Sequence, residues 1–433
     1  MKQLKAFRSV IQIPTLIYLI KWFIICLPIG AIVGSASALF LLSLEWAGNF
    51  RDNHLWMIAL LPLGGLFVGG MYYLWGDSVA KGNNLLLEEF HSPKKVIPLK
   101  MAPLVLIGTI LTHLFGGSAG REGTAVQVGG AVADQFSKLF KLHKYDRKII
   151  IVVGVSAGFA SIFGTPLAGA VFGLEVMIIG RMRYEALVPS FMGAILANFF
   201  CKLYPVTHTH YHMSAIALHT GITPLNLLWA VLAGIFFGLT ALLFSKGMHF
   251  WSNLFKSNIK FPPLRPVIGG AILALSFWVV YQLTDETKYV GLGVPVIANS
   301  FAAPMQGYDF ILKLLFTTFT LGCGFKGGEV TPLFYIGATL GNVLCLFIPL
   351  EMSLLAGMGF VAVFSGATNT PIACTLMGIE LFGIESGCFI AIACVVAYLF
   401  SGHSGIYTSQ IIGSPKSSIF IREKSKHLNE INL

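Results

Sequence analysis

The chain of 433 residues is 55% hydrophobic and only 11% charged, with a net charge of +10 and a mean hydropathy of +0.77. A soluble globular protein carries about 25% charged residues, so this composition excludes a single soluble domain. The basic residues lie in short loops and at both ends of the chain rather than along one stripe, which argues against nucleic-acid binding.

Long apolar stretches recur along the chain, at residues 22–44, 55–75, 149–179, 225–250 and 372–400. Each is close to or beyond the roughly 20 residues that span a bilayer as a helix. Backbone groups in hydrocarbon must be satisfied within their own segment, and the short alternating segments of outer-membrane barrels are missing. The sequence therefore predicts an all-α polytopic membrane protein.

Basic residues flank the apolar region at both ends. Those before the first span are Lys2, Lys5 and Arg8, and those after the last are Lys416, Arg422, Lys424 and Lys426. The positive-inside rule then places both termini in the cytoplasm, which requires an even number of crossings. The first apolar stretch is longer than a signal-peptide core and has no small-residue cleavage site after it, so we expect it to be retained.

The two halves of the chain share a motif. Residues Thr165-Pro166-Leu167-Ala168, followed by Gly173 and Glu175, return 205 residues later as Thr370-Pro371-Ile372-Ala373, followed by Gly378 and Glu380. A glycine-rich segment with a carboxylate precedes each copy, at residues 120–124 and 327–331. Matching helix-interrupting elements in two halves indicate a transporter site near the membrane midplane, although glycines that merely let helices pack closely would leave the same pattern.

The repeat divides the chain into four parts. We expect a cytoplasmic N-terminus over residues 1–20, a first membrane repeat over 20–205, a second over 220–412, and a cytoplasmic tail over 413–433. The tail is too short for a separate soluble domain.

The strongest candidate site is the segment 116–124, which precedes a helical run at 125–140. Its four glycines prevent a regular helix from starting before about Glu122. Backbone N–H groups and the positive end of the following helix can then face an anion. Glu122 would occupy the place of that anion until protonation or competition displaced it. The alternative is that Glu122 only caps its helix.

Three further elements have a similar character. Gly82, Asn83 and Asn84 precede a short run as a second possible anion-binding helix start, although Asn is also an ordinary cap. Residues 325–332 place glycines before an apolar helix and add Glu329 as a second acid, with the Thr331 hydroxyl as a donor. Residues 402–407 end in Tyr407, which could reach an anion from another side or simply anchor the chain at the interface.

In this order the four elements resemble the CLC family of chloride channels and anion/proton exchangers, over about residues 20–412. Glu122 matches the family's gating glutamate and Tyr407 its central tyrosine. The resemblance implies two repeats of inverted topology with broken and re-entrant helices. It also implies a homodimer with one anion pathway in each subunit, and it calls for no cofactor and no metal.

The departures from the chloride members resemble the fluoride/proton antiporter branch. Chloride members carry Gly-Ser-Gly-Ile-Pro where this chain has residues 82–86, a proline at Thr124, and a bulky aromatic at Val330. The internal acid of many chloride/proton exchangers is replaced by Val176, so protons must take another route. The resemblance implies that Glu122 carries the proton and that Glu329 lies near the anion. The implied anion-binding residues are Gly82, Asn83, Asn84, Arg121, Gly123, Val330, Thr331 and Tyr407.

The sequence thus predicts a multi-pass protein of the bacterial inner membrane that exports fluoride in exchange for protons. Its expected partners are fluoride, protons, membrane lipid and a second copy of the chain. Fluoride is small, strongly hydrated and a strong hydrogen-bond acceptor, so its site needs convergent donors. A chloride/proton exchanger and a passive anion channel on the same scaffold remain alternatives. A more remote one is an intramembrane serine hydrolase, because residues 116–120 and 154–158 read G-x-S-x-G, but a nucleophile elbow needs a strand before it.

Overall fold

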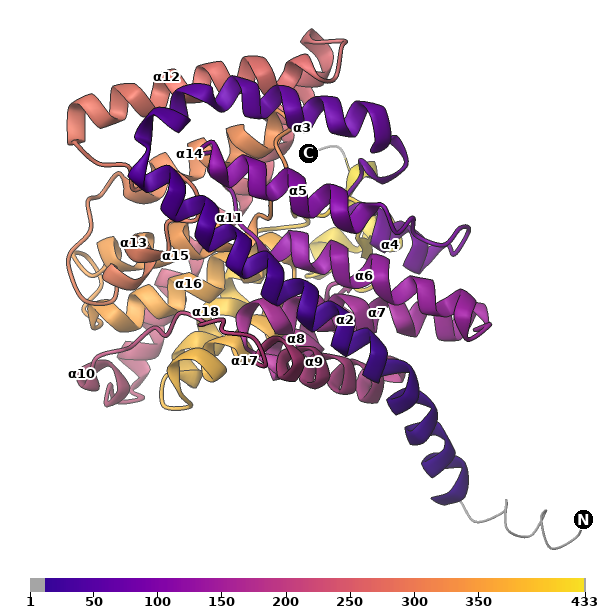
Figure 1. Cartoon of the computed structure of the whole chain (residues 1–433). Coiled ribbons are helices and arrows are strands. Elements are labelled where there is room, and N and C mark those ends of the chain that lie inside the picture. The colour runs from indigo at the N-terminus through magenta and orange to yellow at the C-terminus, as the bar shows by residue number, and fades with distance from the viewer. Residues whose placement is uncertain (1–11, 432–433) are drawn as a thin grey trace, which may run out of the picture.

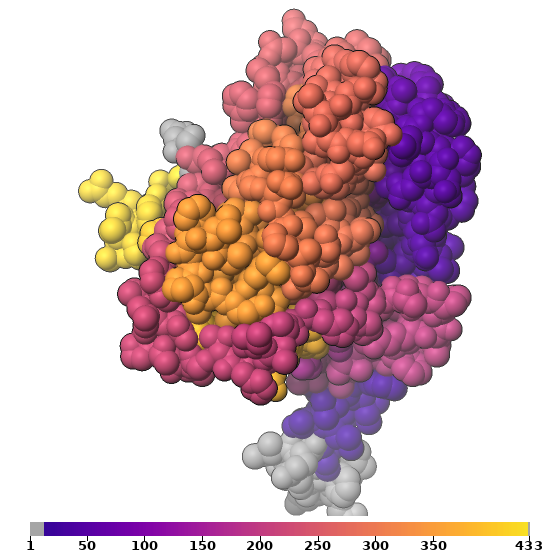
Figure 2. All heavy atoms as spheres, turned by 90° about the vertical axis from the view of Figure 1, so that its left-hand side faces the viewer, coloured from indigo at the N-terminus to yellow at the C-terminus, as the bar shows by residue number. Residues whose placement is uncertain are grey.

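The computed structural model describes residues 12–431, which form a helical body from which the N-terminal part of α2 projects (Figures 1 and 2). The basic residues Lys2, Lys5 and Arg8, on which part of the topology prediction rests, lie outside the described residues. Among those described, the strands are confined to one parallel pair, β1 (Ile178–Ile179) and β2 (Ile411–Ile412). The predicted all-α class is confirmed.

The first half of the chain contains α2 (Gln12–Asn53), η1 (Leu55–Leu60), α3 (Leu61–Trp75), η2 (Asp77–Val79), α4 (Asn83–His91), α5 (Met101–Leu114), α6 (Glu122–Leu139), α7 (Lys144–Phe163), α8 (Pro166–Glu175), η3 (Tyr184–Ala186) and α9 (Leu187–Cys201). The second half contains α10 (Ala215–Leu218), α11 (Pro224–Asn258), α12 (Leu264–Thr284), α13 (Val294–Asn299), α14 (Asp309–Gly322), α15 (Val330–Leu344), α16 (Met352–Thr368), α17 (Pro371–Phe382), α18 (Gly387–Phe400), η4 (Ser418–Glu423) and η5 (Leu428–Glu430).

Two of the predicted spans are broken. The stretch 149–179 is divided between α7 and α8, because Gly164 takes a positive φ of 78° and Pro166 starts a new helix. The stretch 372–400 is divided between α17 and α18 at Gly383, whose φ is +98°. Within residues 12–431, the helical segments long and apolar enough to cross a membrane alone are Ile13–Asn53, Leu55–Trp75, Tyr184–Cys201, Pro224–Asn258 and Leu264–Thr284.

The repeat seen in the sequence returns in the packing. Helix α6 packs on α7 as α15 packs on α16, and α8 contacts α9 as α17 contacts α18. Glycine allows the first two pairs to approach closely. A Cβ at Gly129 would lie 2.1 Å from the Gly154 carbonyl oxygen, and one at Gly337 would lie 2.0 Å from that of Gly359. Some of the glycines therefore serve close helix packing, which was the alternative explanation of the repeated glycine motifs.

Each repeat caps a helix of the other. The two carboxylate oxygens of Glu175 accept hydrogen bonds from Ile372 N (3.1 Å) and Ala373 N (2.8 Å) at the start of α17. Glu380 accepts from Leu167 N (3.0 Å) and Ala168 N (2.7 Å) at the start of α8. A carboxylate on free N–H groups at the positive end of a helix stabilises it by about 1 kcal/mol. The duplicated acids thus join the two halves.

Candidate anion pathway and gate

The two glycine-rich segments meet at the centre of the molecule. Gly120 N donates to Gly328 O at 2.6 Å, and Gly328 N donates to Gly120 O at 2.7 Å. A Cβ at Gly120 would lie 2.9 Å from Gly328 O, and one at Gly328 would lie 2.7 Å from Gly123 N, so a side chain at either glycine would force this junction apart. The junction brings the N-terminus of α6 beside the N-terminus of α15.

Glu122 is the first residue of α6, as predicted from the glycines before it, and its exposed fraction is 1%. Its carboxylate accepts hydrogen bonds from Thr331 N (3.0 Å) and from the Thr331 hydroxyl (2.6 Å to each oxygen). Arg121 N donates to the same carboxylate at 3.2 Å, and Arg121 Nε lies 3.4 Å from Glu122 Oε1. The carboxylate therefore accepts hydrogen bonds at the start of α15, which is the positive end of that helix.

Glu329 is the residue that precedes α15, and Val330, which is buried, begins that helix. Glu329 Oε2 is buried and has no hydrogen-bond partner among the described residues. A Cβ at Gly123 would lie 2.9 Å from Glu329 Oε2 and 3.2 Å from Asn83 Nδ2. The missing side chain of Gly123 thus leaves the space in which this second acid and the Asn83 amide converge.

Asn83 and Tyr407 face a small shared cavity. Helix α4 begins at Asn83 after Gly82, whose positive φ of 57° is a glycine conformation. The cavity has a volume of about 20 Å³, which is room for about one water-sized particle. Asn83 Oδ1 and the Tyr407 hydroxyl are buried without a partner within residues 12–431. Buried polar groups are normally satisfied, so these two unpaired groups mark the polar side of a cavity whose other lining residues are apolar.

Asn84 contacts the chain just after Tyr407. Its side-chain oxygen accepts a hydrogen bond from Ser409 N at 2.9 Å, and the neighbouring Glu88 accepts from the Ser409 hydroxyl at 3.3 Å. These contacts join α4 to the segment that follows Tyr407. Ser409 was not predicted from the sequence, where no local pattern distinguishes it from the other serines.

A larger cavity of about 1270 Å³ adjoins the site and shares Gly82, Asn83, Glu329 and Tyr407 in its lining. The lining also contains four lysines, Lys81, Lys246, Lys256 and Lys326. Positive charge on a cavity wall raises the local concentration of anions. These lysines come from distant segments, so the sequence did not indicate that they would meet.

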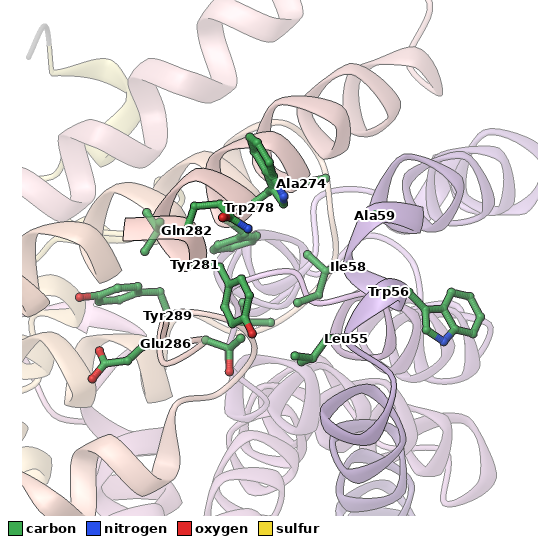
Figure 3. Close-up of a pocket in the computed structure, with 14 residues that line it drawn as sticks. Leu55, Trp56, Ile58, Ala59, Ala274, Trp278, Tyr281, Gln282, Glu286 and Tyr289 are labelled. Atoms are coloured by element: carbon green, nitrogen blue, oxygen red, sulfur yellow. The ribbon is translucent and has the colours of Figure 1, made fainter. Parts of the chain in front are cut away.

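A third cavity, of about 260 Å³, lies between η1 and α12 and is lined mainly by apolar side chains such as Leu55, Ile58 and Trp278 (Figure 3). Its lining, taken over residues 12–431, includes none of the predicted site residues. It is therefore separate from the site around Glu122.

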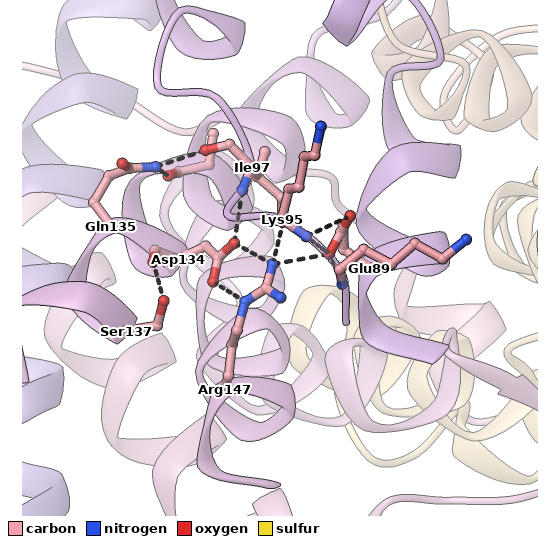
Figure 4. Close-up of polar contacts among 9 residues, drawn as sticks. Glu89, Lys95, Ile97, Asp134, Gln135, Ser137 and Arg147 are labelled. Carbon is pink, nitrogen blue, oxygen red and sulfur yellow. Dashed lines mark hydrogen bonds and ion pairs between the residues drawn. The ribbon is translucent and has the colours of Figure 1, made fainter. Parts of the chain in front are cut away.

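A buried ionic cluster holds the far end of α4 (Figure 4). Arg147 of α7 lies between Asp134 of α6 and Glu89 of α4, with nitrogen–oxygen distances of 2.8 Å and 3.0 Å. Arg147 also donates to the Lys95 carbonyl at 2.6 Å, and Asp134 accepts from Ile97 N at 2.8 Å. The cluster fixes α4, and with it Asn83, against α6 and α7.

Comparison with known proteins identifies the family of this chain. The voltage-gated chloride channel family matches residues 64–402. A chloride/fluoride channel protein of Pseudomonas syringae pv. tomato is 51% identical over 420 residues, which are 96% of this chain and 91% of the relative. The voltage-gated ClC-type chloride channel ClcB of Escherichia coli is 28% identical over 310 residues, 68% of this chain and 71% of ClcB.

Solved structures share the fold. The crystal structure of a CLC-type fluoride/proton antiporter superposes with a TM-score of 0.86 at 34% identity, covering 90% of this chain and 98% of that one. A slow cyanobacterial Cl⁻/H⁺ antiporter has a TM-score of 0.73 at 21% identity, covering 88% and 94% of the two chains. The resemblance noted from the motifs is confirmed, and the chain belongs to the voltage-gated chloride channel, or CLC, family.

Proposed function

We propose that this CLC-family protein exports fluoride from a bacterial cell in exchange for protons, with Glu122 as both gate and proton carrier. The observation that carries the proposal is the contact of the Glu122 carboxylate with the N–H and hydroxyl groups of Thr331 at the start of α15. A carboxylate in this position competes with any anion for the same donors. Gate and substrate therefore exclude one another, which is what exchange requires.

Protonation is the step that frees the donors. A neutral carboxyl loses most of its attraction for the positive helix end and for the N–H group of Thr331. The acid can then leave, and a small anion can replace it. When the acid loses its proton, it returns and expels the anion. Glu329 supports this cycle, because a second buried carboxyl close to Glu122 makes it unfavourable for both acids to be charged at once and so favours protonation.

The donors around the site suit fluoride. A strongly hydrated ion gives up its water only where several hydrogen-bond donors replace it. We assign this task to Asn83, Thr331, Tyr407 and the backbone N–H groups near Gly123. The remaining proposed anion-binding residues are Gly82, Asn84, Arg121 and Val330. Fluoride is also named for the Pseudomonas relative and for the antiporter whose structure superposes on this chain.

We also propose how the chain is oriented in the membrane and how it assembles. Residues 20–205 and 220–412 form the two membrane repeats, both termini face the cytoplasm, and two copies associate within the lipid bilayer, each with its own pathway. The tail over residues 413–433 then lies on the cytoplasmic side, as does the lysine-lined cavity.

The test of substrate uses purified protein in liposomes loaded with equal fluoride and chloride, with one ion-selective electrode for each anion outside. We expect fluoride to leave the vesicles with coupled proton uptake, and little chloride to move. Fast chloride movement would make the protein a chloride transporter of the same family. Fluoride movement without proton uptake would make it a channel, the word used in the name of the Pseudomonas relative.

A further inference from the structure

The C-terminal tail returns to the segment that carries Tyr407. Residues 425–429 run antiparallel to residues 408–412, with a bridge between Ile411 and His427. The two segments exchange four backbone hydrogen bonds: Asn429 N to Thr408 O (3.1 Å), Leu428 N to Gln410 O (3.1 Å), Ile412 N to Lys426 O (3.0 Å) and Ser425 N to Ile412 O (2.7 Å). The tail thus extends the β1–β2 pair.

Side chains of the tail strengthen this contact. Leu428 is 3% exposed and packs in one apolar cluster with Ile179 and Ile412. It also reaches the glycine two residues before Tyr407, since a Cβ at Gly405 would lie 3.2 Å from Leu428 Cδ1. The tail therefore touches the chain on both sides of Tyr407.

The tail also lines the large cavity that adjoins the site. Leu428, Asn429 and Ile431 line the 1270 Å³ cavity together with Tyr407. His427 Nδ1 lies 3.2 Å from the Ser409 carbonyl, and its ring meets the ring of His91 in α4 at a centroid separation of 6.0 Å. The tail thus contacts two of the elements that line the small cavity, the Tyr407 segment and α4.

Other contacts hold the Tyr407 segment against the helical body. Gln410 Nε2 donates to the carbonyls of Val176 (2.8 Å) and Thr368 (2.9 Å), and Ser409 N donates to Asn84. These groups belong to packed helices or their ends. Within residues 413–431 the helical pieces are the short η4 and η5, and His403 pairs with Glu423 upstream of residues 425–431. Residues 425–431 can therefore separate from residues 408–412 without unfolding a helix of the core.

We infer that residues 425–431 form a C-terminal clasp that positions the Tyr407 hydroxyl at the anion site. This inference rests on the proposed function, because the coupling of proton movement to anion movement requires that Tyr407 be correctly placed at the anion site. With the clasp closed, Tyr407 is held at the small cavity, and an anion passes only when Glu122 is protonated and leaves its donors on Thr331. With the clasp open, the Tyr407 segment loses its partner strand, and anions pass without the matching proton.

The test compares two substitutions at one position. Asn429→Pro removes the N–H group that donates to Thr408 O, and proline suits the second position of the short helix η5. Asn429→Ala keeps that N–H group and serves as the matched control. Loss of one hydrogen bond favours the open clasp by about five-fold. Leu428→Ala, which removes the buried anchor, gives a second and independent route to the open state.

The readout is the number of protons moved per anion in liposomes, measured with the anion that the unmodified protein carries. We expect the ratio to fall in Asn429→Pro and Leu428→Ala, to stay unchanged in Asn429→Ala, and all three proteins to keep the melting temperature of the parent within a few degrees. An unchanged ratio in both Asn429→Pro and Leu428→Ala would overturn the clasp. A parent protein that moves chloride instead of fluoride would refute the proposed substrate, and the same ratio would still test the clasp.

Discussion

Removal of Arg147 tests the ionic cluster that holds α4 (Figure 4). In Arg147→Leu, Asp134 and Glu89 remain buried together without their shared cation; their side chains are 0% and 12% exposed. Removing one partner of a buried ion pair destabilises a protein by about 3–5 kcal/mol. Backbone donors to both acids remain, from Ile97 N to Asp134 and from Lys94 N to Glu89, so we expect the lower end of that range.

The assay is equilibrium unfolding of the purified protein in mixed micelles, followed by tryptophan fluorescence. Lys21→Leu is the matched control, because Lys21 pairs at 2.7 Å with Asp146, the neighbour of Arg147, but is 41% exposed. An exposed pair contributes about 0–1 kcal/mol. Neutralising the acids as well, in Asp134→Asn with Glu89→Gln, should recover part of the loss. An Arg147→Leu protein no less stable than Lys21→Leu would refute this account of the cluster.

Three changes test the anion site in liposomes. Glu122→Gln keeps the shape of the gate without its charge, so we expect proton uptake coupled to anion efflux to disappear; undiminished uptake would remove Glu122 from its role. Asn83→Ser replaces the amide at the small cavity by a hydroxyl, and we expect selection against chloride to weaken, as measured by the ratio of the two electrode signals. Gly123→Ala would place a Cβ 2.9 Å from Glu329 Oε2, so we expect transport to fall by about ten-fold, the effect of roughly 1.4 kcal/mol of strain at the site. An Ala variant as fast as the parent would mean that the space beside Gly123 is not used.

The parts of the site that the sequence predicted are local ones. Helices begin at Glu122, just after Gly82 and just after Gly327 and Gly328, in agreement with the sequence, because glycines interrupt the helical run that precedes each start. Broken helices were expected from the family resemblance, but the positions of the breaks at Gly164 and Gly383 were missed, because mean hydropathy stays high through a stretch whose backbone turns. Hydropathy measures how apolar the side chains are. It does not report where the backbone hydrogen bonds of a helix end.

The contacts that assemble the site join residues far apart in sequence. The Gly120–Gly328 junction and the Glu122–Thr331 contact each connect one half of the chain to the other. Only the matching motifs in the two halves were visible before the structure. No motif in the sequence predicted the Arg147 cluster or the contact of Leu428 with Gly405. A single arginine or leucine becomes distinctive only when the fold buries it.

The most direct test of fluoride/proton exchange uses liposomes with an acidic interior, the membrane potential held at zero, and equal fluoride on both sides. Exchange predicts that fluoride accumulates inside as protons leave. Hydrofluoric acid that leaks through lipid would move fluoride the other way, toward the alkaline side, so the direction alone identifies the protein's activity. No net fluoride movement under the proton gradient, with rapid movement under a fluoride gradient, would contradict exchange and establish a passive channel.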